Sequence, residues 1–149
     1  MSFENTSNGS FRLEISSDFR WLDVLNASLT AVAEELEWDV DFTNAVSISA
    51  IEAASNAIEH GNGLDSSKKV WMKVNFEDGK FMMGIRDEGP GVDASVLDRP
   101  APRPDDLSLR GRGFSIMNAL MDDIRFLRDD EGQFTLELEK LLPESGEAE

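Results

Sequence analysis

The sequence has no cysteine, a single histidine and no long apolar run. Without cysteine the chain can form no disulfide framework, thiolate nucleophile or cysteine metal site, and one histidine excludes a multi-histidine metal cluster. A bound metal ion would therefore need oxygen ligands. No window approaches the roughly 18 uninterrupted apolar residues of a membrane span, and the N-terminal MSFENTSNGS lacks the basic and apolar regions of a signal peptide. We expect a soluble, cytoplasmic protein.

Basic residues are also scarce. The chain has 14 Lys and Arg against 30 Asp and Glu, which gives a formal net charge of −16. Such a charge would repel DNA, RNA and anionic membranes, whereas it would attract a basic protein partner. On charge alone we favour the simpler alternative, that the acidity only keeps the protein soluble.

The length of 149 residues and the hydrophobic content of 40% suit one globular domain that buries its own core. We assign this domain to residues 1–142. The remaining residues 143–149, PESGEAE, are predicted to form a disordered acidic tail.

Two long segments have helical periodicity. The first is predicted to run from a cap at Asp18 to about Trp38. Its apolar face would consist of Trp21, Leu22, Leu25, Leu29, Val32 and Leu36. The second is predicted to begin at Asp41 or Thr43 and to end at the glycines of GNGLDS, residues 61–66, which we interpret as a helix stop and loop.

Alternating apolar residues predict strands. One short strand is expected over residues 11–16, FRLEIS. The alternation over 70–76 and 81–85, on either side of the turn EDGK, predicts a hairpin. A second hairpin would join 124–128 to 133–139.

The segment between the two hairpins has a different composition. Residues 92–110 contain three prolines, several charges and little apolar periodicity, which indicates a mobile loop. Helical spacing returns in GFSIMNALM, residues 113–121.

The second helix carries three polar residues at a spacing of one turn. In EAASNAIEHGN, Glu52, Asn56 and His60 would lie on one helix face. An ordinary solvated face is the simplest interpretation of Glu52 and Asn56. His60 can cap the helix C-terminus or take part in catalysis, and we favour the cap because a cation there interacts well with the helix dipole.

Two glycine motifs flank the proline-rich loop. In IRDEGPGVD, Asp87 ends a strand and precedes Gly89 and Gly91, which let the backbone turn sharply and approach a ligand closely. An aspartate at this position could accept hydrogen bonds from a flat polar ring. Taken alone, however, the motif is more often just a turn.

The second motif, RGRGFSIMNALM, places Gly111 and Gly113 directly before a helix, where free backbone N–H groups and the helix dipole favour a phosphate. Arg110 and Arg112 add positive charge beside it. On its own this motif is often only a helix cap. No P-loop sequence and no G-x-G-x-x-G after a strand is present.

Together, and in this order, the three segments resemble the N box and the two glycine boxes of the GHKL ATPase superfamily. The histidine after N-A-I-E, the run D-E-G-P-G and the string G-R-G-x-x-I-M-x-x-L-M-D are most similar to the RsbW and SpoIIAB type of anti-sigma factor serine kinases. The resemblance extends from about residue 18 to 140. It implies a two-layer α/β sandwich of the Bergerat type, in which about three helices cover one face of a mixed sheet of about five strands.

The resemblance also implies roles for the site residues. Asn56 would hold a Mg²⁺ ion that bridges the phosphates of ATP, and Glu52 would act as the catalytic base. Asp87 would accept the adenine amino group. Gly89 and Gly91 would admit the base and ribose, and the residues that cradle the phosphates would be Gly111, Arg112 and Gly113. Arg110 would contact phosphate or merely solvate the loop 92–110, which would be the ATP lid.

The function implied by the resemblance is an ATP- and Mg²⁺-dependent serine/threonine protein kinase that is also an anti-sigma factor. Its partners would be a sigma factor and a STAS-domain antagonist that it phosphorylates, and the kinase itself would be a homodimer. Two alternatives remain open, because fold does not fix function. One is a nucleotide-binding module that sequesters a partner without phosphate transfer, and the other is the catalytic half of a histidine kinase.

Overall fold

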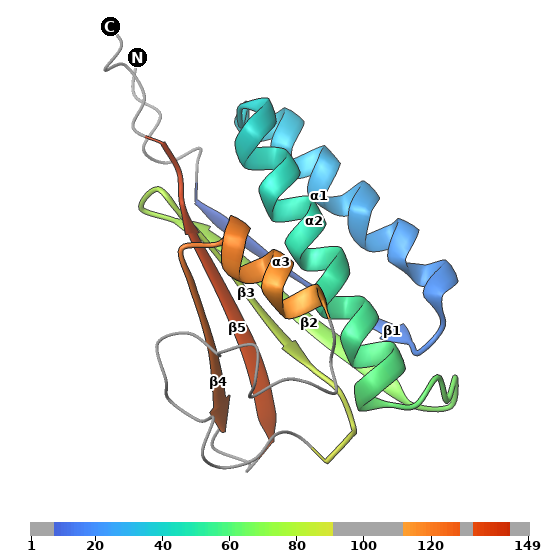
Figure 1. Ribbon diagram of the computed structural model, residues 1–149. Coiled ribbons are helices and arrows are strands. Elements are labelled where there is room, and N and C mark those ends of the chain that lie inside the picture. The colour runs from blue at the N-terminus through green and yellow to red at the C-terminus, as the bar shows by residue number, and fades with distance from the viewer. Residues whose placement is uncertain (1–7, 91–111, 129–132, 144–149) are drawn as a thin grey trace, which may run out of the picture.

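The chain folds into one sheet with helices on one of its faces (Figure 1). The computed structural model describes residues 8–90, 112–128 and 133–143. The strands are β1 (Gly9–Ser16), β2 (Lys69–Glu77), β3 (Lys80–Arg86), β4 (Asp123–Arg128) and β5 (Phe134–Leu141). The helices are α1 (Leu22–Leu36), α2 (Val40–Asn56) and α3 (Arg112–Leu120), with a 3₁₀ turn η1 (Phe19–Trp21) and a π-helical turn η2 (Ala57–Gly61).

The predicted α/β sandwich is confirmed, but the sheet is not mixed. Its order is β1-β2-β3-β5-β4, and every described pair of neighbouring strands is antiparallel. Two helices, rather than one, connect β1 to β2, so the chain returns to the end of the sheet where β1 finished. The single helix α3 between β3 and β4 does give these two strands the same direction, yet β5 lies between them.

Both predicted hairpins are present, because the period-two alternation places every second side chain in the core. On β2 and β3 the buried residues are Val70, Met72, Val74, Phe76, Phe81, Met83 and Ile85. The turn at Asp78 and Gly79 requires positive φ at both residues. The second hairpin pairs β4 with β5, and its connection over 129–132 lies outside the described residues.

The helices begin and end close to the predicted positions, with two corrections. Asp18 caps the 3₁₀ turn η1 by accepting from the Arg20 N–H, and Trp21 at its end is 41% exposed rather than part of the apolar face. The cap of α2 is Asp39, and not Asp41 or Thr43, because its carboxylate accepts from the Phe42 N–H at 2.7 Å.

The core lies between the sheet and the helices, and α2 occupies its centre. Helix α2 contacts both α1 and α3, and it buries small residues along its length: Ala45, Ala50, Ala53 and Ala54. Small side chains let the neighbouring helices approach closely. The C-terminal end of α2 therefore meets the N-terminal end of α3, and this junction positions the candidate site.

Candidate functional site

Two of the predicted site residues lie one turn apart at the C-terminal end of α2. Glu52 is half-buried, and Asn56, the last residue of α2, is only 6% exposed. The Nδ2 group of Asn56 has no hydrogen-bond partner among the described residues. A buried amide N–H without a partner costs free energy, so native proteins seldom leave one unless a ligand or water uses it. The site offers this amide to a ligand.

The first turn of α3 closes directly over these two side chains. A Cβ atom added to Gly113 would lie 2.7 Å from Asn56 Nδ2 and 3.0 Å from Glu52 Oε1. Only a glycine lets the backbone of α3 come this close without displacing them. The free N–H groups and the positive end of the α3 dipole therefore lie beside the amide and the carboxylate.

The third residue of the predicted stripe, His60, differs from the other two in its exposure. After Asn56 the helix widens into the π-helical turn η2, in which the Asn62 N–H donates to Ala57 O at 2.9 Å. His60 lies within this turn. His60 is exposed, with Nε2 3.9 Å from Glu59 Oε1. It lies in the last helical turn, the position that the capping interpretation requires.

The π-helical turn brings Gly61 against the first glycine motif. A Cβ on Gly61 would overlap Asp87 Oδ2, and a Cβ on Gly89 would overlap the carbonyl oxygen of Gly61. The Asp87 carboxylate accepts from the Gly89 N–H at 2.8 Å. Asp87 remains half-buried rather than buried, and a carboxylate has about four lone-pair sites, so it can still accept from a ligand.

The described residues thus bring Glu52, Asn56 and Gly113 together, and separately Asp87, Gly89 and Gly61. Gly91, Arg110 and Gly111 lie outside them, as does the predicted lid over 92–110. Of Arg112 the structure describes the backbone alone, as the first residue of α3.

Comparison with known proteins decides the family. A model of the histidine kinase-like ATPase domain matches residues 15–140. The chain belongs to the histidine kinase-like ATPase domain family. This range includes both clusters of site residues.

Relatives in this family support the assignment. The chain is 34% identical over 114 residues to an anti-sigma F factor of Bacillus subtilis (strain 168), which covers 74% of this chain and 77% of that protein. An anti-sigma F factor of Bacillus licheniformis is 32% identical over 121 residues, which covers 79% of this chain and 82% of that protein. The predicted resemblance to anti-sigma factors is confirmed.

A solved structure has the same fold. The crystal structure of the RsbU and RsbW domains of a Mycobacterium tuberculosis protein matches with a TM-score of 0.62 at 17% identity. The match covers 90% of this chain and 32% of that longer chain. At this identity the likeness supports the fold alone.

The described residues fit the nucleotide that an ATPase domain family implies. Gly61 and Gly89 pack too closely around Asp87 to carry side chains. The carboxylate of Asp87 is therefore flanked there by backbone atoms alone, which allows a flat base to approach it. The buried, unpaired amide of Asn56 lies at the N-terminus of α3, which is the favoured place for a phosphate. The amide oxygen is a suitable ligand for a small hard cation at the same place.

None of the helices in the described ranges is long and apolar enough to span a membrane.

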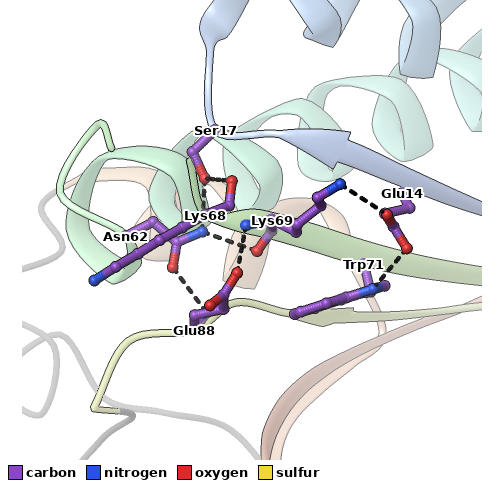
Figure 2. A network of polar contacts seen from close by, with 7 residues as sticks. All are labelled: Glu14, Ser17, Asn62, Lys68, Lys69, Trp71 and Glu88. Carbon is purple, nitrogen blue, oxygen red and sulfur yellow. Dashed lines mark hydrogen bonds and ion pairs between the residues drawn. The ribbon is translucent and has the colours of Figure 1, made fainter. Parts of the chain in front are cut away.

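Sequence reasoning missed Asn62, which lies in the predicted helix stop and loop over 61–66. Asn62 is 2% exposed and bonds to Lys69 and to two residues that are distant in sequence, Ser17 and Glu88 (Figure 2). An asparagine after a helix-ending glycine is an ordinary loop residue in the sequence. Only the tertiary structure shows its partners.

Proposed function

We propose that the protein is an ATP- and Mg²⁺-dependent serine/threonine protein kinase that also acts as an anti-sigma factor. The observation that carries this proposal is the packing of Gly113 against both Glu52 and Asn56, because it joins a carboxylate, an unpaired buried amide and a helix N-terminus in one place. The names of the relatives, anti-sigma F factors, support the regulatory part.

In this proposal the nucleotide lies on the helical side of the sheet. Asp87 accepts a hydrogen bond from the adenine amino group, and Gly89 and Gly91 leave room for the base and ribose. The N-terminus of α3 binds the phosphates through the backbone of Gly111 and Gly113, and Arg110 and Arg112 add positive charge. In a chain with a net charge of −16, these local donors must offset the repulsion of a triphosphate.

Asn56 would hold the Mg²⁺ ion through its amide oxygen. When bound, the ion neutralises charge on the phosphate oxygens, which is a large part of what phosphoryl transfer requires. Glu52, one turn away and half-buried, orients the hydroxyl group of the protein substrate and accepts its proton. The lid over 92–110 excludes water from the site while the substrate is bound.

The proposed partners are a sigma factor and a STAS-domain antagonist. The kinase, as a homodimer, holds the sigma factor inactive until unphosphorylated antagonist displaces it. Phosphorylation of the antagonist on serine or threonine then releases it again. An acidic kinase should bind its partners with an affinity that falls as salt rises, if charge contributes to the interface.

The test is a transfer assay with γ-labelled ATP, Mg²⁺ and the STAS-domain proteins encoded near the gene. We expect Glu52→Ala to reduce transfer by roughly 100- to 10,000-fold, the usual contribution of a positioned base, while ATP affinity stays nearly unchanged. The matched control is Glu34→Ala, which removes an exposed carboxylate from α1 and should change neither quantity.

Three outcomes would contradict parts of the proposal. Loss of ATP binding in Glu52→Ala would show that this residue does not act only on the hydroxyl group. ATP binding without transfer to any candidate would favour a module that sequesters its partner. Label on a histidine would favour the catalytic half of a histidine kinase.

A further inference from the structure

Asn62 lies at the centre of a buried polar network between the end of η2 and three other segments (Figure 2). Its Nδ2 group donates to Ser17 Oγ at 2.6 Å and to Lys69 O at 2.9 Å. Its Oδ1 atom accepts from the Glu88 N–H at 2.7 Å. Both N–H bonds and the oxygen of this amide are therefore used.

The network is buried at Asn62 and Ser17 and reaches the surface at Lys69 and Glu88, so it extends on both sides of Asn62. Ser17, just after β1, is 1% exposed, and its hydroxyl group donates to Lys68 O at 3.0 Å. The Glu88 carboxylate accepts from the Lys69 N–H at 2.6 Å. Satisfied hydrogen bonds in a buried network hold one arrangement of the groups that make them. Here they join the end of β1 and the start of β2 to the loop after β3.

Residues 61 and 62 thereby contact three successive residues of that loop. The Asp87 carboxylate lies against Gly61, the Glu88 N–H is bound by Asn62, and Gly89 packs on the carbonyl oxygen of Gly61. Glu88 is the middle residue of the three, so the bond to Asn62 fixes the backbone directly after Asp87. Neither Asp87 nor Gly89 donates to Asn62, which acts on the carboxylate through the loop backbone.

We infer that Asn62 is a positioning residue for Asp87 and, through it, sets the preference for adenine over other purine bases. The inference rests on the proposed function, in which Asp87 accepts the adenine amino group. Hydrogen bonds weaken steeply when their angle departs from linearity, so a carboxylate that moves by about 1 Å loses much of its selectivity. Asn62 holds it in place without touching the nucleotide.

The experiment compares the affinities of the purified protein for Mg-ATP and Mg-ITP by calorimetry. ITP has a carbonyl oxygen where ATP has its amino group, so it presents an acceptor to the Asp87 carboxylate. We expect the wild-type protein to prefer ATP by roughly tenfold or more, as expected for a hydrogen bond to a charged group. In Asn62→Ala the ratio of the two dissociation constants should fall towards one.

Ser17→Ala is the matched control. It removes a group that is equally buried and belongs to the same network, but it leaves the bond between Asn62 Oδ1 and the Glu88 N–H in place. We expect this variant to lose stability and to keep the wild-type preference for ATP. Equal loss of preference in both variants would overturn the inference, because general loosening would then explain the effect. So would an unchanged preference in Asn62→Ala.

Asn62→Ala removes three hydrogen bonds and so can destabilise the fold, and a second measurement therefore uses the wild-type protein alone. Native-state hydrogen exchange should find the Glu88 amide protected, since its acceptor belongs to a side chain that is 2% exposed. Exchange at the rate of an open loop would overturn the inference.

The wild-type result also separates this inference from the proposed function. No binding of Mg-ATP would refute the proposed function and the inference with it. Binding of Mg-ATP without any preference over Mg-ITP would refute the role of Asp87 and of Asn62, while ATP binding itself would stand.

Discussion

Asn56 and Asn62 belong to the same segment and are both buried, yet their amides are bonded in opposite ways. Asn62, 2% exposed, uses both N–H bonds and its oxygen within the protein. Asn56, 6% exposed, leaves Nδ2 unpaired within the described ranges. Burial is nearly equal, so it does not explain the difference. The protein completes the hydrogen bonds of one amide and keeps the other available, which separates a structural amide from one that can bind a ligand.

The difference shows how the site is built. Asn56 faces the junction of α2 and α3, where a ligand can replace the missing partner. Asn62 lies beyond the π-helical turn, where the chain leaves the helix and meets the sheet. The turn therefore separates a binding end, which contains Asn56, from a structural end, which contains Asn62. The structural end must be rigid, because it holds the loop that contains Asp87.

The largest expected effect is a difference in stability between the variants Asn62→Ala and Asn56→Ala. Asn62→Ala removes one hydrogen bond each from the hydroxyl of Ser17 and the backbone groups of Lys69 and Glu88, so the free energy of unfolding should fall by about 3 kcal/mol. Asn56→Ala removes an amide whose N–H was already unpaired and should change it by less than about 1 kcal/mol. Urea unfolding of both variants measures the two values. Equal losses would remove the distinction between the two amides.

The next largest effect is on ATP binding, for which Asn56 and not Asn62 should be the more sensitive position. Asn56→Ala removes the proposed Mg²⁺ ligand and should weaken Mg²⁺-dependent ATP binding roughly tenfold. The lost interaction stabilises the complex with Mg-ATP and not the free protein. Titrations with and without Mg²⁺ measure the change. The Mg²⁺-independent part of the affinity serves as the internal control and should not change. A loss of the same size without Mg²⁺ would assign Asn56 to the nucleotide itself.

A smaller effect is expected where α3 meets the binding end. In Gly113→Ala the new methyl group would press on Asn56 and Glu52, which must move by several tenths of an ångström. Alanine favours the helix by about 1 kcal/mol, so stability should hardly change while ATP affinity falls several-fold. Gly63→Ala is the control. Because Gly63 has a φ of 64°, an alanine there should lower stability. No neighbouring atom lies within 4 Å of the new Cβ, so the affinity for ATP should stay unchanged.

Much of the fold could be predicted from the sequence because local periodicity determines it. The alternation in β2 and β3 identifies the buried face of the hairpin, and Leu25 and Leu29 of α1 are fully buried as predicted. Strand direction could not be predicted. It depends on whether β5 or β4 is the neighbour of β3, and both strands have the same alternating pattern.

The candidate site was predictable where spacing along one helix decides contacts. Glu52 and Asn56 lie together because α-helical register persists to the end of α2. His60 lies in a π-helical turn, which no pattern in the segment indicates, and it is exposed where Asn56 is buried. Asn62 could not be found, since its bonds to Ser17 and Glu88 join residues that only the tertiary fold brings together.

The smallest effect concerns the exposed arm of the network in Figure 2, which differs from the buried part by relying on charge. Hydrogen bonds from Lys69 at 3.2 Å and from the Trp71 indole at 3.0 Å, together with the charge of Lys69, hold the pKa of Glu14 below its usual value. Its contribution to stability is therefore full above the usual carboxyl pKa and is lost as the pH falls through the lowered one.

The difference in unfolding free energy between the wild-type protein and Glu14→Gln should consequently be small at neutral pH and vanish in acid, because these groups are exposed and well screened. Urea unfolding from neutral to acidic pH measures it, with Glu34→Gln on α1 as the control for an isolated exposed carboxylate. The amide of Asn62 carries no charge, so the cost of Asn62→Ala should persist over the same range wherever the protein stays folded. A cost that also vanished in acid would show that the buried network depends on an ionised group, and Glu88, whose carboxylate accepts from the Lys69 N–H, would then be the residue to change.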